Sequence, residues 1–118
     1  MHTVIETGLF LRRAAEAGMT DAERFELVGF IAAHPESGDV IQGTGGVRKL
    51  RFAGQGKGKS GGYRVITFFT GANLPVFVLT VFAKGALTNL SKAERNSLQK
   101  LTAILADTYA RKVSALKR

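Results

Sequence analysis

Three extended runs in the middle of the chain constrain its fold more than any other feature of the sequence. They cover residues 47–53, 63–70 and 74–83, and the last two consist mainly of β-branched, aliphatic and aromatic residues. A loop with five glycines (54–62) joins the first two runs, and Gly71-Ala-Asn73 joins the second to the third. Because short connections join antiparallel neighbours, the sequence predicts a small antiparallel sheet. The third run is almost continuously apolar, which is typical of a central strand covered on both faces.

The N-terminal third of the chain is predicted to form one short strand and two helices. Residues 2–6 place apolar residues between polar ends, as in a short strand. Residues 8–18 fit a short helix that stops at its final glycine. Thr20-Asp-Ala-Glu23 is a capping box, in which the threonine hydroxyl accepts from the Glu23 amide while the glutamate reaches back. The helix that it opens is predicted to end before Pro35.

A second capping box, Ser91-Lys-Ala-Glu94, opens a C-terminal helix whose apolar residues recur at helical spacing as far as Val113. The predicted order of elements is β-α-α-β-β-β-α. The fold class that follows is α+β: a small antiparallel sheet with N-terminal helices and a long C-terminal helix packed on it. We expect a single domain over residues 1–118, because this length is ordinary for one hydrophobic core.

The composition excludes several classes of protein. The chain has no cysteine, which rules out disulfides and thiolate metal sites and fits a reducing cytoplasm. No segment approaches the roughly 18 apolar residues that a membrane-spanning helix requires. Residues 1–8 include Glu6 and lack a basic start, unlike a secretory signal. We therefore expect a cytoplasmic protein that uses no metal or other cofactor and does not enter a membrane.

The net charge of +8 is concentrated in the middle of the chain. Residues 40–93 contain eight basic residues and no Asp or Glu, whereas the rest of the chain contains nine residues of each sign. A surface with this composition favours a polyanionic partner such as nucleic acid. The alternative is a general solubilising charge, which would intersperse both signs.

Several of these basic residues lie on the predicted strands. Side chains alternate along a strand, so Lys49 and Arg51 share one face. Arg48 lies on the opposite face, near the strand end where it can reach water. Arg64 lies within an apolar run, with no carboxylate near it in sequence. It either forms an internal ion pair or contacts an anionic ligand, and the lack of a nearby acid favours the ligand. Lys84 ends the third run and is expected at the same edge of the sheet.

The glycine loop carries Lys57 and Lys59. It is one residue short of a Walker A sequence, because Ala53 replaces the first glycine. A strand rather than a helix follows Ser60, so the arrangement that binds nucleoside triphosphates is not expected. Two interpretations stay open: a flexible cationic finger that approaches a phosphate backbone, and a mobile hairpin connection.

Residues 40–93 contain neither a histidine nor a carboxylate, so a conventional acid–base pair is missing there. A metal site is equally unsupported. An enzyme built from this surface would work with lysines and arginines, which suits RNA cleavage. RNA carries its own nucleophile, the 2′-hydroxyl, which a lysine can help to deprotonate, and an arginine can stabilise charge on the phosphorane. Neighbouring cations lower the pKa of a lysine from about 10.4, which makes it a better base.

Four blocks of sequence stand in a characteristic order. They are Gly43-Thr-Gly-Gly-Val-Arg-Lys-Leu-Arg-Phe52, Gly58-Lys-Ser-Gly-Gly-Tyr-Arg-Val-Ile66, Val81-Phe-Ala-Lys84 and Asn89-Leu-Ser-Lys-Ala-Glu-Arg95. Together they resemble the RelE/HigB toxin superfamily of type II toxin–antitoxin systems, and its HigB2-like branch in particular. The similarity extends from about Val4 to Tyr109.

The resemblance implies a ribosome-dependent mRNA endonuclease, or mRNA interferase, that inhibits translation by cutting codons in the A site. It also implies a cognate antitoxin with a helix-turn-helix domain, and binding to operator DNA only through that antitoxin. The catalytic residues that it implies by motif are Arg64, Lys84, Lys57 and Lys59. The RNA-binding residues are Arg48, Lys49, Arg51 and Lys92.

The chain departs from its relatives at Ala86-Leu87, where charged residues are common, and loss of an ion pair there would weaken activity. Two further functions therefore stay open. One is a non-catalytic RNA- or ribosome-binding protein, such as a degenerate toxin. The other is an interaction protein whose basic face meets only an acidic segment of a protein partner.

Overall fold

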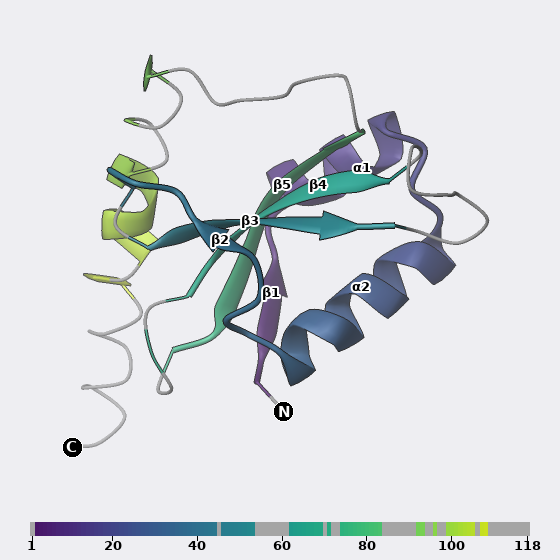
Figure 1. Cartoon of the computed structure of the whole chain (residues 1–118), viewed down its shortest axis with the longest axis horizontal. Coiled ribbons are helices and arrows are strands. Elements are labelled where there is room, and N and C mark those ends of the chain that lie inside the picture. The colour runs from purple at the N-terminus through teal and green to yellow at the C-terminus, as the bar shows by residue number, and fades with distance from the viewer. Residues whose placement is uncertain are drawn as a thin grey trace.

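The computed structural model describes residues 2–44, 46–53, 62–69, 71, 74–83, 92–93, 96, 99–105 and 107–108. These residues form one five-stranded sheet with helices against it (Figure 1). The strands are β1 (Val4–Glu6), β2 (Asp39–Val40), β3 (Val47–Phe52), β4 (Tyr63–Phe68) and β5 (Val76–Ala83). The helices with defined bounds are α1 (Gly8–Glu16) and α2 (Asp21–Ala33). The predicted α+β class is confirmed.

The sheet has the strand order β1-β5-β4-β3-β2. Strands β2 to β5 pair antiparallel with their neighbours, as predicted, and β5 lies between two strands as the apolar run required. The prediction of a purely antiparallel sheet is wrong, because β1 pairs parallel with β5. Alternation of side chains identifies a strand but not its direction, and parallel neighbours need a long connection that leaves no local signal. The two-residue strand β2 was also missed.

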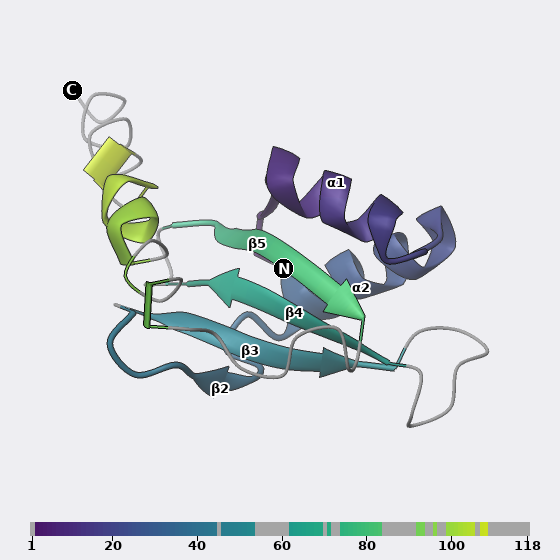
Figure 2. The ribbon, with the colours of Figure 1, turned by 90° about the horizontal axis from the view of Figure 1, so that it is seen from above.

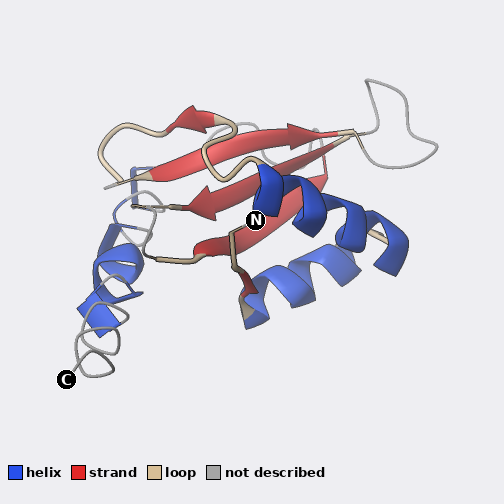
Figure 3. Cartoon of the chain, turned by 90° about the horizontal axis from the view of Figure 1, so that it is seen from below, coloured by secondary structure: helices blue, strands red, loops and turns tan. Residues whose placement is uncertain are grey.

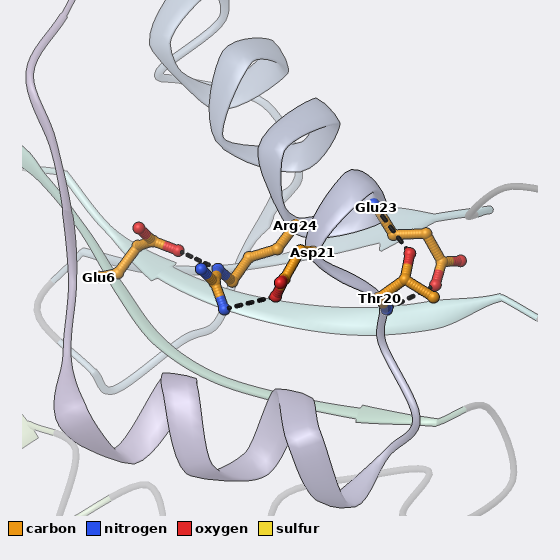
Figure 4. Close-up of polar contacts among 5 residues, drawn as sticks. All are labelled: Glu6, Thr20, Asp21, Glu23 and Arg24. Carbon is orange, nitrogen blue, oxygen red and sulfur yellow. Dashed lines mark hydrogen bonds and ion pairs between the residues drawn. The ribbon is translucent and has the colours of Figure 1, made fainter.

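Both N-terminal helices begin at a threonine cap. The Thr7 hydroxyl accepts from the Phe10 amide at 3.2 Å and donates to the Val78 carbonyl at 2.9 Å, which ties the start of α1 to β5. The capping box of α2 is confirmed. The Thr20 hydroxyl accepts from the Glu23 amide at 3.1 Å, and the Glu23 carboxylate accepts from the Thr20 amide at 2.9 Å (Figure 4).

Helices α1 and α2 cover the same face of the sheet (Figures 2 and 3), which we call the helix-covered face. Its core is fully buried and contains residues from both helices and the three long strands: Phe10, Ala14, Leu27, Ile31, Leu50, Tyr63, Val65, Val76, Val78 and Val81 among others. Helix α2 ends at Ala33 with His34 as its C-cap, and so ends before Pro35 as predicted. Tertiary packing of this apolar side is what stabilises the helices.

The opposite side, which we call the second face, has a smaller core among the described residues. It consists of Val47, Ile66, Phe68, Phe77 and Leu79, with Leu105 packed against it. An irregularity between Ile66 and Thr67 places two β5 residues, Leu79 and Thr80, opposite one residue of β4. This bulge shifts the alternation of β5 by one residue, so Phe82 lies on the second face with Phe77 and Leu79.

The C-terminal helix is confirmed only in part. Residues 99–105 and 107–108 are helical, and the Thr102 hydroxyl donates to the Thr44 carbonyl at 3.3 Å. This contact holds the helical residues at the end of the sheet where β3 begins, away from α1 and α2 (Figure 3). The predicted capping residues Ser91 and Glu94, and Val113 as the last residue of the predicted apolar side, lie outside the described residues.

Candidate nucleic-acid interface

Three cations lie together on the second face of the sheet: Lys49 and Arg51 from β3, and Arg64 from β4. We call them the basic cluster. Arg51 is the direct cross-strand partner of Arg64, and Lys49 is the partner of Ile66. Cross-strand partners point to the same face, so the two guanidinium groups project side by side. The structure therefore confirms that Lys49 and Arg51 share a face, and adds Arg64 to it.

The position of Arg64 is fixed by its neighbours in the strand. Tyr63 and Val65 are both 0% exposed and anchor β4 in the helix-covered face. The Tyr63 hydroxyl donates to the Glu23 carboxylate at 3.2 Å, which links the start of β4 to the capping box of α2. Arg64 is only half-buried and points the other way. A rigid strand thus presents a cation to solvent, which is favourable for a binding site because little freedom is lost on binding.

The basic cluster lines an open hollow of about 490 Å³. Its other lining residues are Gly38, Asp39 and Leu50. Gly38 allows the wall to approach closely: its φ is +93°, and a Cβ atom there would lie 2.6 Å from the Lys49 carbonyl oxygen. Only glycine tolerates both conditions. The chain consequently turns into β2 directly beside Lys49.

Like charges directly opposite each other in a sheet are destabilising, by a few tenths of a kcal/mol to about 1 kcal/mol. Within the described part of the chain, no carboxylate forms an ion pair with Lys49, Arg51 or Arg64; the ion pairs found there involve Arg13 and Arg24. The internal ion pair considered for Arg64 is thus not found among the described residues. A bound anion would relieve the repulsion between Arg51 and Arg64 and could accept from both guanidinium groups.

Arg48 lies apart from the basic cluster. Its guanidinium donates to the backbone carbonyls of Glu36 at 2.9 Å and Gly38 at 3.4 Å. These bonds hold the turn that leads into β2, and so support the wall of the hollow. The assignment of Arg48 to RNA binding stays a prediction, but the contacts that it makes here are internal.

The remaining predicted site residues are not among the described residues that line the hollow. Lys92 is exposed on the C-terminal segment and is not among the lining residues. Lys57, Lys59 and Lys84 lie outside the described residues. The strand ends that flank them are close: Phe52 pairs with Tyr63, and Tyr63 pairs with Ala83. Strands β3 and β5 end, and β4 begins, at this end of the sheet (Figure 2).

Asp39 is the lining residue that the sequence did not indicate. It immediately precedes the acid-free stretch, and pairing of β2 with β3 places it opposite Lys49. An exposed two-residue strand has no periodicity to detect, so the sequence pattern gives no signal for this arrangement.

A family model described as "RelE toxin of RelE / RelB toxin-antitoxin system" matches residues 3–118, which is nearly the whole chain. The chain belongs to the RelE toxin family. The basic cluster therefore belongs to a protein of a toxin–antitoxin family. The resemblance seen in the sequence is confirmed at the level of the family.

Two negative findings accompany this assignment. Among the described residues of this RelE family member, no group of three or more His, Cys, Asp or Glu side chains is arranged to hold a metal ion. No helix within the same residues is long and apolar enough to cross a membrane.

Proposed function

We propose that the protein is a toxin that cleaves mRNA on the ribosome, in the cytoplasm, and that a cognate antitoxin neutralises it. The observation that supports this most strongly is the pairing of Arg51 with Arg64 on a rigid strand pair, beside Lys49 and an open hollow. Two adjacent guanidinium groups beside an open hollow match the oxygens of a phosphodiester. Membership of the RelE toxin family supplies the biological setting.

In the proposed reaction the RNA 2′-oxygen attacks the adjacent phosphorus and the bond from phosphorus to the 5′-oxygen breaks. A lysine among residues 57, 59 and 84 takes the 2′-hydroxyl proton and later releases it to water. The departing 5′-oxygen takes a proton from water. Arg64, assisted by Arg51, stabilises the extra negative charge on the phosphorane. The products are a 2′,3′-cyclic phosphate and a free 5′-hydroxyl, and no metal or cofactor takes part.

Regulation and partners follow from the same proposal. The antitoxin carries a helix-turn-helix domain, and the pair contacts operator DNA through that domain alone. Within the RelE family we assign the chain to the HigB2-like branch on the order of its sequence blocks. Lys49 and Arg51 position the message through its phosphates, together with Arg48 and Lys92.

The deciding experiment is expression of the chain in a bacterium, with primer-extension mapping of message ends. We expect growth arrest and cuts in phase with codons. Arg64→Ala should lower the cleavage rate about 10²- to 10³-fold, the usual effect of removing a group that stabilises transition-state charge. Arg12→Ala is the matched control, because Arg12 is an exposed arginine on α1. It should cleave like the wild type.

Two outcomes would contradict the proposal. Intact message together with ribosome binding that depends on Arg64 would favour the non-catalytic RNA-binding alternative. Intact message and ribosome binding that does not respond to salt would favour an interaction protein, because phosphate contacts weaken steeply as salt rises.

A further inference from the structure

The outer side of α2 exposes large apolar side chains beside charged ones. Only Glu23, Leu27 and Ile31 of this helix are buried. Phe25 is 84% exposed and Phe30 is 41% exposed. A helix that packs on a sheet with one side normally carries polar residues on the other. The exposed phenylalanines therefore indicate that a partner covers this side of α2.

Phe25 stands beside a second hollow, of about 460 Å³. We call it the α2 hollow. It is lined by Glu6, Asp21, Ala22, Arg24, Phe25 and Val28. It thus combines an apolar wall from α2 with a polar rim contributed partly by the edge strand β1. Concave sites with an apolar wall and a few fixed charges are typical of places that accept a side chain of a partner.

The rim of the α2 hollow carries an excess of negative charge. Arg24 contacts Glu6 at 3.0 Å and Asp21 at 3.4 Å, so one guanidinium serves two carboxylates (Figure 4). The side chain of Asp21 is 96% exposed. One negative charge at this rim is left uncompensated by Arg24, and a cation on a partner would compensate it.

The charge of the N-terminal part of the chain, which includes α1 and α2, agrees with this local excess. Residues 1–38 contain six acidic and three basic residues, whereas residues 39–118 contain three acidic and fourteen basic residues. The molecule is therefore strongly polarised. A polyanion would be repelled from the α1 and α2 side, and a partner with basic residues would be attracted to it.

We propose that the α2 hollow docks a segment of a partner protein that presents an apolar side chain flanked by Lys or Arg. An amphipathic helix with basic flanks has this chemistry. The inference rests on the proposed function in one respect, because the partner of a toxin is its antitoxin. It goes beyond that function by placing the antitoxin on α2, where it leaves the basic cluster uncovered.

A second copy of the chain fits the α2 hollow poorly. The basic surface that would be attracted to it is itself concave where Lys49, Arg51 and Arg64 lie. Two concave surfaces do not fill each other, and shape complementarity is required of a stable interface. The partner is consequently a different chain, one with a projecting apolar side chain.

The test uses the purified full-length chain and the full-length protein encoded by the adjacent gene, with affinity measured by isothermal titration calorimetry. Phe25→Ala should raise Kd about tenfold or more, as expected for an aromatic anchor seated in a pocket. Asp21→Lys should weaken binding in the same direction. Thermal melts followed by circular dichroism establish that both variants are folded, since both side chains are largely exposed.

Two controls locate the effect. Leu11→Ala removes an apolar side chain that is 40% exposed on α1, in the same layer but outside the α2 hollow. Lys49→Ala removes a cation of the basic cluster. Both should leave Kd within about twofold of the wild type, which is the range expected outside a hot spot.

Three results would overturn the inference. The first is an unchanged Kd for Phe25→Ala, or a larger loss of affinity for Lys49→Ala than for Phe25→Ala. The second is a failure of the adjacent-gene protein to bind the wild type. The third is a dimer of the chain alone, seen by sedimentation, that Phe25→Ala dissociates. Message cleavage without the partner is measured separately for each variant, so failure of the proposed nuclease function appears as intact message whatever the binding data show.

Discussion

The two faces of the sheet differ in how they use the same kind of alternating strand. On the helix-covered face, side chains from α1, α2 and the three long strands form a continuous core. On the second face, the described residues form a smaller core, and Lys49, Arg51 and Arg64 lie beside it around an open hollow. Adjacent residues of one strand, such as Tyr63 and Arg64, therefore serve opposite purposes. The packed core of the helix-covered face therefore holds the strands rigid, and the rigid strands fix the charged side chains of the second face in place.

The largest effect on stability is expected from a substitution in the core of the helix-covered face. Leu27 of α2 is 0% exposed, and Leu27→Ala should lower the free energy of unfolding by about 2–5 kcal/mol, because it leaves a cavity in the core. Urea denaturation measures this loss. Binding of single-stranded RNA by the molecules that stay folded should be unchanged. A weaker RNA affinity with unchanged stability would show that the two faces are not divided as described.

A smaller effect is expected from the wall between β2 and β3. Gly38→Ala must accommodate a φ of +93° and a Cβ atom 2.6 Å from the Lys49 carbonyl oxygen, and should cost about 1–3 kcal/mol of stability. It should also weaken RNA binding, since the displaced wall lines the hollow. Gly29→Ala on α2 is the matched control, because a Cβ there meets nothing within 4 Å. An RNA affinity of Gly38→Ala equal to that of the wild type would show that this wall of the hollow does not contribute to RNA binding.

The smallest effect on stability is expected from the basic cluster itself. Lys49→Ala should change the free energy of unfolding by less than about 0.5 kcal/mol, because it removes a half-buried cation that has no described ion pair. It should make the salt dependence of RNA binding less steep by about one in the slope of log K against log salt concentration. Fluorescence anisotropy over a series of salt concentrations measures this slope. A steeper or unchanged slope would place Lys49 outside the RNA contact.

The sequence predicted those parts of the fold that depend on local chemistry. The capping box at Thr20 is visible because two side chains and two amides satisfy one another within four residues. The central place of β5 followed from an apolar run that needs cover on both faces. The facing of Lys49 and Arg51 followed from alternation alone.

The parts that were missed depend on contacts between distant residues. Nothing in Val4–Glu6 indicates a parallel partner, since the partner strand begins at Val76. The bulge opposite Ile66 also gives no signal in the sequence, because Leu79 and Thr80 lie in an almost continuously apolar run. The direct pairing of Arg51 with Arg64 needed the register of β3 and β4, which a glycine-rich loop does not specify.

The parallel pairing of β1 with β5 has a consequence for the order of events during synthesis. Val4 leaves the ribosome early, but its partner Val76 follows only after most of the chain has been translated. At typical elongation rates of about 5–20 residues per second, the delay is roughly 4–15 seconds. During this time the edge strand has no neighbour, and the long-range pairing must wait before folding can finish. The described sheet is therefore complete only after β5, its last strand in the chain, has emerged from the ribosome.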